Sequence, residues 1–158
     1  MLHVLFISVL MLTAPNLQAQ ERENARWGFA REVERTYTPS KVVYDLSSGS
    51  VDQLADILDR ASFLSTVYEA DPFEASIVIV IHGSAIPFFT TGAYPTYREL
   101  MERAQSLTVG NIVEFRMCRA SAKSMGVAST DVHGFVTMVP MADAEIVELN
   151  RDGYVYMK

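Results

Sequence analysis

The sequence of 158 residues has a single cysteine, Cys118, and lacks the motifs that mark several large enzyme classes. It contains no Gly-rich Walker loop for nucleotide phosphates, no G-x-G-x-x-G turn for dinucleotides and no G-x-S-x-G elbow for a serine nucleophile. One cysteine cannot form an internal disulfide or a C-x-x-C pair. The three histidines, of which His3 lies near the start, have no spacing typical of a zinc site. Metal catalysis is therefore disfavoured.

Formal charge is missing from the first segment, since residues 1–19 contain no Lys, Arg, Asp or Glu. Residues 4–12 form a short apolar run, and Leu17-Gln18-Ala19 precedes a charged stretch that follows Gln20. This pattern predicts a secretory signal peptide over residues 1–19. The run is too short to cross a bilayer, which takes about 20 apolar residues. We therefore expect a periplasmic protein with no membrane anchor after cleavage; the alternative is an apolar arm of the folded protein.

The formal net charge of −6 argues against nucleic acid and anionic membranes as partners, because both would repel an acidic surface. In an oxidising compartment, a lone cysteine must be buried, capped, paired with another chain or used chemically. Cys118 is thus the first candidate for chemistry.

Strand and helix patterns alternate after a polar segment at residues 20–40, which is expected to be a helix or an arm. The helix after residue 50 begins with a capping box of Ser50 and Gln53, and Ile77–Ile81 reads as a strand buried on both faces. The pattern predicts one α/β domain over residues 41–158, with a mostly parallel five-stranded sheet and helices on both faces. Strands are expected at residues 41–46, 77–81, 111–117, 134–139 and 154–156, and helices after Ser50, Tyr94, Cys118 and Pro140.

Three candidate features should share the carboxyl edge of this sheet, where open parallel sheets bind ligands. They are the loop at residues 47–50, the His82-Gly83 corner and Cys118. The serine-rich loop either holds an anion or flavin phosphate or simply caps its helix, and capping by Ser50 already accounts for it. Gly83 either belongs to the site or is needed for a turn with positive φ.

The segment at residues 84–94 is expected to be a long loop rich in Pro, Gly, Thr and aromatic residues. Its aromatic side chains, Phe88, Phe89 and Tyr94, either line a pocket or subunit contact or pack on their own domain. Asp131 and His133 are expected to be turn residues near the fourth strand.

Cys118 lies where a strand is expected to end and a short helix, stopped by Gly126, to begin. Unpaired N–H groups and the helix dipole favour a thiolate at such a position. Arg116, Arg119 and Lys123 add positive charge nearby in the sequence. His82 is a candidate base or hydrogen-bond donor to a bound sulfur species. The alternatives are that Cys118 is a small buried hydrophobe and that His82 bonds a backbone group.

Residues 41–158 resemble the DsrE/DsrF-like proteins of sulfur metabolism, which include YchN-like proteins. The resemblance rests on three segments: residues 79–85 (IVIHGSA), the strand–Cys118–helix unit that closes on Met125-Gly126-Val127, and residues 147–156 (VELNRDGYVY). It implies an α/β fold related to flavodoxin-like sheets and assembly as trimers or hexamers. In the sulfur-relay members, a cysteine at the position of Cys118 accepts and passes on sulfane sulfur as a persulfide.

The leading interpretation is an exported DsrE-like protein that binds or relays sulfane sulfur on Cys118, with binding contributions from His82, Gly83 and Arg119. Its partners would be a sulfur donor or acceptor protein or a small thiol, and no cofactor is expected. The second interpretation is a non-catalytic oligomeric module that holds a small anion or flavin-type cofactor at the sheet edge, with Cys118 merely packed.

Overall fold

The computed structural model describes residues 27–158. The folded domain is a compact unit of residues 36–158, separate from the unit that ends at Arg35. Residues 28–40 form neither helix nor strand. This part of the expected N-terminal segment is therefore an arm. The predicted signal peptide, residues 1–19, lies outside the described residues, as do residues 20–26.

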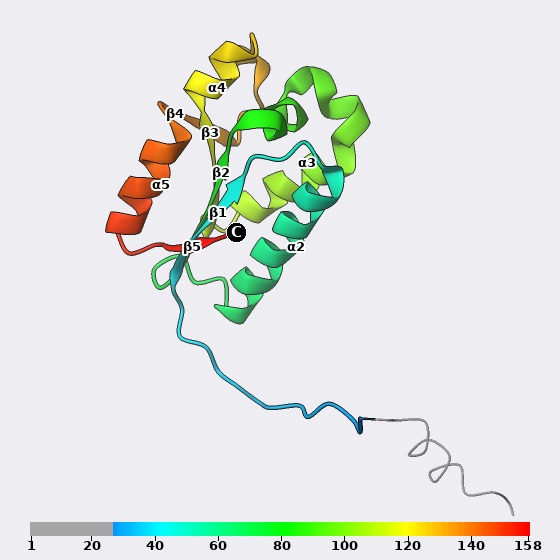
Figure 1. Ribbon diagram of the computed structural model, residues 1–158, viewed down its shortest axis with the longest axis vertical. Helices are drawn as coiled ribbons and strands as arrows, with labels where there is room; N and C mark the ends of the chain where they lie inside the picture. Colours follow the sequence, from blue (N-terminus) through cyan, green and yellow to red (C-terminus); the bar gives the residue numbers. More distant parts are fainter. Residues whose placement is uncertain (1–26) are drawn as a thin grey trace, which may run out of the picture. The chain divides into compact units, whose positions relative to one another are not determined.

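Five strands alternate with helices along the domain, as the sequence predicts (Figure 1). The strands are β1 (Lys41–Leu46), β2 (Ser76–Ile81), β3 (Val113–Cys118), β4 (Val136–Val139) and β5 (Val155–Met157). The α-helices are α2 (Val51–Val67), α3 (Tyr94–Thr108), α4 (Arg119–Ser124) and α5 (Ala142–Arg151). Ser50 caps α2, since its side-chain oxygen accepts a hydrogen bond from the N–H of Gln53 at 3.3 Å.

The strands form one sheet in the order β4-β3-β2-β1-β5, and every neighbouring pair is parallel. The predicted α/β class is confirmed. The chain adds β2, β3 and β4 in turn on one side of β1 and then crosses back to place β5 on the other side. A flavodoxin-like sheet also has a strand on that side of β1, but there it is the second strand of the chain.

The right-handedness of parallel crossovers explains how the helices are distributed. The connections from β1 to β4 all step across the sheet in one direction, so their helices cover one face. The connection from β4 to β5 steps in the opposite direction, so α5 covers the other face. Figure 1 shows α5 on one side of the sheet, with α2 and α3 on the opposite side.

The central strand β2 contributes to both cores, because residues 77–81 are fully buried. Ile77, Ile79 and Ile81 pack in the large core with α2 and α3, whereas Val78 and Val80 face α5. This is why the strand is continuously apolar. The core beneath α5 is small and consists of Val43, Val78, Val80, Cys118, Ala142 and Leu149.

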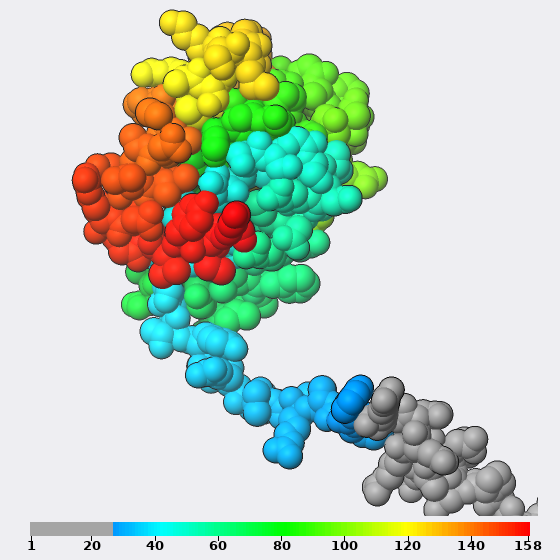
Figure 2. All heavy atoms as spheres, in the orientation of Figure 1, coloured from blue at the N-terminus to red at the C-terminus, as the bar shows by residue number. Residues whose placement is uncertain are grey.

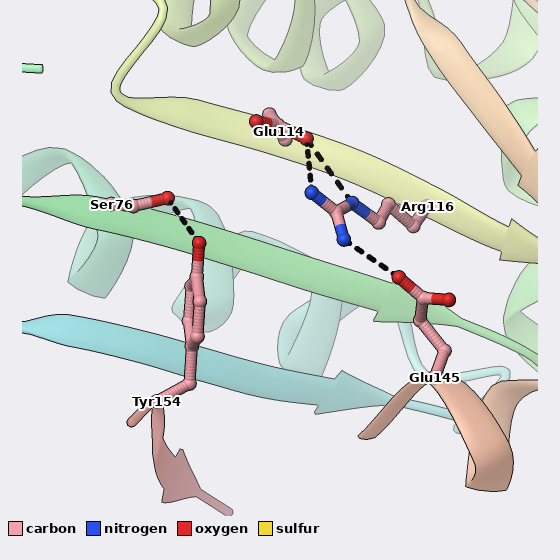
Figure 3. A network of polar contacts seen from close by, with 5 residues as sticks. All are labelled: Ser76, Glu114, Arg116, Glu145 and Tyr154. Atoms are coloured by element: carbon pink, nitrogen blue, oxygen red, sulfur yellow. Dashed lines mark hydrogen bonds and ion pairs between the residues drawn. The ribbon is translucent and has the colours of Figure 1, made fainter. Parts of the chain in front are cut away.

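Polar side chains surround the small core on the face that α5 covers (Figure 3). Arg116 donates through Nη1 to Glu145 of α5 at 2.6 Å and through Nη2 to Glu114 at 2.7 Å. The hydroxyl groups of Tyr154 and Ser76 are hydrogen-bonded at 2.9 Å. The Arg116–Glu145 ion pair therefore fixes α5 against β3.

The segment expected to be a long loop instead forms two short 3₁₀ helices, Gly83–Phe89 and Thr91–Ala93. Phe88 is 4% and Phe89 0% exposed. The ring of Phe88 meets Tyr97 edge-on, and Phe89 packs on Phe115. Burial of these aromatic residues holds the segment in tight turns, and both phenylalanines pack on their own domain.

His133 is more than a turn residue, because its ring is packed among aromatic side chains. The ring stacks on Phe135 with centroids 5.7 Å apart and meets the ring of Tyr94 at 5.6 Å. Its Nε2 is buried and has no hydrogen-bond partner in the described part of the chain. Burial lowers the pKa of His133, because the charged imidazolium would lose its hydration. Asp131 does act as a turn residue, accepting from the N–H of Ala128 at 3.1 Å.

We expect His133 to make the domain less stable in mild acid. Its folded-state pKa lies below the ordinary value of about 6.5, so the unfolded chain binds the proton more readily. The contribution of neutral His133 to the free energy of unfolding is fully present above the ordinary pKa. It is lost as the pH falls from that value through the lower pKa of the folded state. Urea unfolding of the wild type and of His133→Leu should therefore diverge between neutral and mildly acidic pH, the wild type losing more stability. Parallel pH profiles for the two proteins would contradict this.

Candidate functional site

The three features at the carboxyl edge come together as topology requires. β1 ends at Leu46, β2 at Ile81 and β3 at Cys118, and the three strands are adjacent and parallel. The loop at residues 47–50, the His82-Gly83 corner and Cys118 therefore follow neighbouring strand ends.

Cys118 is the last residue of β3 and the N-cap of α4. Its Sγ accepts a hydrogen bond from the N–H of Ser121 at 3.4 Å. The residue is only 3% exposed and packs beside Val80 and Ala142 in the small core. The thiol is thus both a packed side chain and the cap of a helix, so the two interpretations made from sequence describe the same geometry.

A second helix terminus also reaches the sulfur. Cys118 pairs with Val139 of β4, and α5 begins three residues later at Ala142. Burial raises the pKa of the Cys118 thiol, but hydrogen bonds from the side chain and N–H of Ser121 and from the N–H groups of Ala142 and Ala120 outweigh it. The net pKa is lowered.

Sequence reasoning missed the contribution of α5, because it requires β4 to pair with β3. The available signal was the helix start after Pro140, close behind a predicted strand end. Figures 1 and 2 show the α4 region (yellow) and the beginning of α5 (orange) side by side, and the N–H of Ala120 donates to the carbonyl of Pro140 at 3.3 Å.

The cationic side chains predicted to favour the thiolate do not form a positive cluster at the sulfur. Arg116 forms ion pairs with Glu114 and Glu145, so its charge is neutralised locally. Arg119 and Lys123 lie on α4 and are exposed to solvent. This part of the prediction is wrong for Arg116, because a salt bridge to α5 satisfies its guanidinium. No cation is among the causes of the lowered pKa of Cys118: the Ser121 side chain contributes most, followed by the backbone N–H groups of Ser121, Ala142 and Ala120.

His82 follows β2 and forms a chain of polar contacts with β1 and the edge strand β5. Its Nε2 lies 2.7 Å from Oδ1 of Asp45 on β1, and Oδ2 of the same carboxylate accepts from the hydroxyl of Tyr156 on β5 at 2.8 Å. The side chains of His82 and Asp45 are 25% and 22% exposed. The hydrogen bond to Asp45 raises the pKa of Tyr156, because the neutral phenol is the donor.

The imidazole of His82 is therefore turned toward β1, on the opposite side of β2 from Cys118. The alternative that His82 bonds a backbone group through its ring does not describe it, since the partner of the ring is the Asp45 side chain. Asp45 and Tyr156 were missed. The sequence did offer a signal for Asp45, which is the only charged residue of the strand at residues 41–46 apart from Lys41 at its start. Tyr156 had no such signal, because only the pairing of β5 with β1 brings it beside Asp45.

Gly83 and the serine loop are shaped by tight backbone packing. Gly83 has φ +54°, and a Cβ built on it would meet the carbonyl oxygen of Ser47 at 3.2 Å. Ser48 accepts from the N–H of Ser50 at 3.1 Å, and Ser50 caps α2. Local capping thus occupies the side chains of this loop.

Within residues 27–158, no group of three or more His, Cys, Asp or Glu side chains is arranged to hold a metal ion. In the same residues, no helix has the length and apolar character to span a bilayer.

Residues 41–158 match the model of the DsrE/DsrF-like family. The chain belongs to that family. Among curated proteins, none matches it. A solved structure with the same fold is that of the protein of unknown function MTH1491 from Methanobacterium thermoautotrophicum, with a TM-score of 0.63 and 18% identity. The similarity covers 75% of this chain and 97% of the other. At this identity the likeness shows the fold alone.

We expect Ser121→Ala to raise the pKa of Cys118, because it removes the hydroxyl that helps to stabilise the thiolate. The pH dependence of iodoacetamide labelling in the folded protein measures this. The wild-type midpoint should lie below the ordinary value for cysteine, about 8.5, and the variant's midpoint should be higher.

Ser124→Ala is the matched control, since Ser124 lies on the same helix and its hydroxyl donates to the carbonyl of Ser121. Burial of the thiol slows labelling at every pH, so the midpoint and not the rate reports the pKa. A wild-type midpoint at or above the ordinary value would mean that the thiol is not activated.

Proposed function

We propose that this protein carries sulfane sulfur on Cys118 as a persulfide. The observation that carries the proposal is the convergence of N–H groups from α4 and α5 on the sulfur of the chain's single cysteine. Membership of the DsrE/DsrF-like family supports a role in sulfur relay in general terms. The persulfide on Cys118 is the specific form that we propose.

The loading step is a thiol–disulfide type of exchange. The Cys118 thiolate attacks the outer sulfur of a donor R–S–SH, a new S–S bond forms on Sγ, and the donor's S–S bond breaks with its electron pair leaving on R–S⁻. In the second step an acceptor thiolate attacks the outer sulfur, and the electron pair returns to Sγ. One sulfane sulfur moves in each step, and there is no net oxidation or reduction.

Backbone donors suit this cycle because Cys118 is both the nucleophile and the leaving group. A lowered pKa keeps the thiolate populated for attack and makes it a better leaving group when the sulfur is passed on. Only 3% of Cys118 is exposed, so a donor must reach the sulfur past the starts of α4 and α5, which lie beside it. We therefore expect a partner that contacts these two helix ends.

The alternative function is a binding module in which Cys118 is only packed. The position of Cys118 in the small core with Val80 and Ala142 favours it. The two functions differ in one respect that can be measured directly, which is whether the cysteine takes up sulfur.

Intact mass spectrometry after exposure to polysulfide should show a gain of one sulfur atom in the wild type. The gain should disappear on treatment with a reducing thiol. Cys118→Ser should show no gain, because the chain has no other cysteine to hold the sulfur. A wild-type protein that labels with iodoacetamide yet never gains sulfur would contradict the proposal and favour the binding module.

We also propose that the protein is exported and self-associates. The uncharged leader at residues 1–19 supports export, and the 55% and 43% exposed side chains of Val155 and Tyr156 on the outer strand β5 support association through apolar surface. Protein recovered from the periplasm should begin at Gln20 by mass, and light scattering should give a trimer or a multiple of it. A cytoplasmic protein that retains Met1, or a monomer at micromolar concentration, would refute the respective part.

A further inference from the structure

We infer that His82 is a general base for the acceptor thiol that receives sulfur from Cys118, and that Asp45 and Tyr156 position its ring. This inference rests on the proposed function and adds a second functional group to it. It assigns different tasks to the two strand ends: backbone donors hold the Cys118 thiolate, and the His82–Asp45 pair prepares the incoming thiol.

The first observation is the orientation of the imidazole. With the Asp45 carboxylate accepting at Oδ1 from the Nε2–H of His82, the lone pair of the neutral ring is on Nδ1. The second carboxylate oxygen accepts from Tyr156, so both oxygens of Asp45 are held. A carboxylate that fixes the tautomer and orientation of a histidine is the arrangement by which enzymes position a base.

The second observation is the position of this pair relative to Cys118. Val80 is in register with Arg116 and Ile81 with Met117, so His82 and Cys118 are the next residues of adjacent parallel strands. Both lie on the α5 side of the sheet, because each is two residues beyond a residue that faces α5. Adjacent strands are about 4.8 Å apart. The outer sulfur of a persulfide extends about 2 Å from Sγ. The end of β2, where His82 lies, is therefore next to the place where a thiol would attack that sulfur.

The third observation argues against a direct action of His82 on the Cys118 thiol. Its ring leans toward β1, away from Cys118, and Cys118 already has N–H donors that lower the pKa of its thiol. The side chain of His82 is 25% exposed, whereas Cys118 is 3% exposed. The imidazole of His82 is thus more accessible to an incoming molecule than the thiol of Cys118 is.

The step balances in atoms and electrons. Nδ1 of His82 takes the proton of the acceptor R′–SH, and R′–S⁻ attacks the outer sulfur of the Cys118 persulfide. The S–S bond to Sγ breaks, its electron pair remains on Cys118 as the thiolate, and the product is R′–S–SH. The imidazolium then returns its proton to solvent.

The charged and titratable groups around His82 come from several elements. Asp45 lies on β1, Tyr156 on β5 and Cys118 on β3. Arg116 lies on β3, two residues before Cys118, and is ion-paired with Glu145 of α5. The pH dependence of the transfer rate would combine the responses of all these groups. The test therefore keeps the pH constant and compares a protonated acceptor thiol with an anionic one.

The experiment measures single-turnover transfer from the full-length protein, loaded with polysulfide, to two acceptors at neutral pH. β-Mercaptoethanol is almost wholly protonated under these conditions, whereas thionitrobenzoate is already an anion. His82→Gln should slow transfer to β-mercaptoethanol by about 10²-fold, the lower end of the usual effect of a general base. Transfer to thionitrobenzoate should be unchanged, as should loading, because polysulfide is also an anion.

Positioning by Asp45 is tested by Asp45→Asn, which should give a smaller loss with the same dependence on the acceptor. It also carries the test if His82→Gln does not fold. Added imidazole should restore transfer by His82→Ala to β-mercaptoethanol only. Ser76→Ala, on the same strand and face but outside the chain of contacts, is the control and should behave as wild type.

Equal losses with both acceptors, or no loss with either, would overturn the role of His82 while leaving the sulfur carrier intact. Failure of the wild type to load sulfur at all would instead overturn the proposed function, and this inference with it. Mass analysis before the transfer step separates these two results.

Discussion

The position of β5 beside β1 is the constraint on which both parts of the site depend. Because the chain builds β2 to β4 in one direction, reaching β1 again requires a crossover in the opposite direction, and right-handedness then places α5 on the far face of the sheet. The N-terminus of that helix arrives beside Cys118, and the strand that follows it brings Tyr156 to Asp45. One reversal of direction thus supplies a donor to the sulfur and an anchor for the histidine pair.

The same reversal makes the two faces unequal. Three helices cover one face, whereas the ten-residue α5 covers the other and buries a small cluster beneath it. Polar groups occupy the remainder of that face, where water reaches the sheet. Cys118, Asp45 and His82 all belong to this less covered face, so the candidate site lies beside the smaller of the two cores. A packed thiol at the margin of a small core needs less disruption to become exposed than one beneath α2 and α3.

The fold was predictable from sequence because its signals are local. The buried run at residues 77–81, the cap at Ser50 and the stop at Gly126 each depend on neighbouring residues, and the structure has an element boundary at or near each of them. What could not be predicted depends on contacts between distant segments. Arg116 looked like a free cation near Cys118, yet Glu145 on a helix 29 residues away neutralises it. The partner of His82 on β1 is 37 residues away, and no spacing rule connects them. The aromatic residues near Phe88 were ambiguous for the same reason, since their partners lie on other elements.

Hydrogen bonds, and not nearby cations, lower the pKa of Cys118. Hydrogen bonds from backbone N–H groups act at short range and in partial burial, so salt screens them far less than it would screen a cluster of surface cations. They are also directional, and they hold only while α4 and α5 keep their places around the sulfur. The sulfur-carrier function proposed above would therefore be served best by a partner that admits the donor without displacing the two helix ends. The role inferred for His82 agrees with this, because the neighbouring and more exposed strand end is where an incoming thiol would arrive before it reaches Cys118.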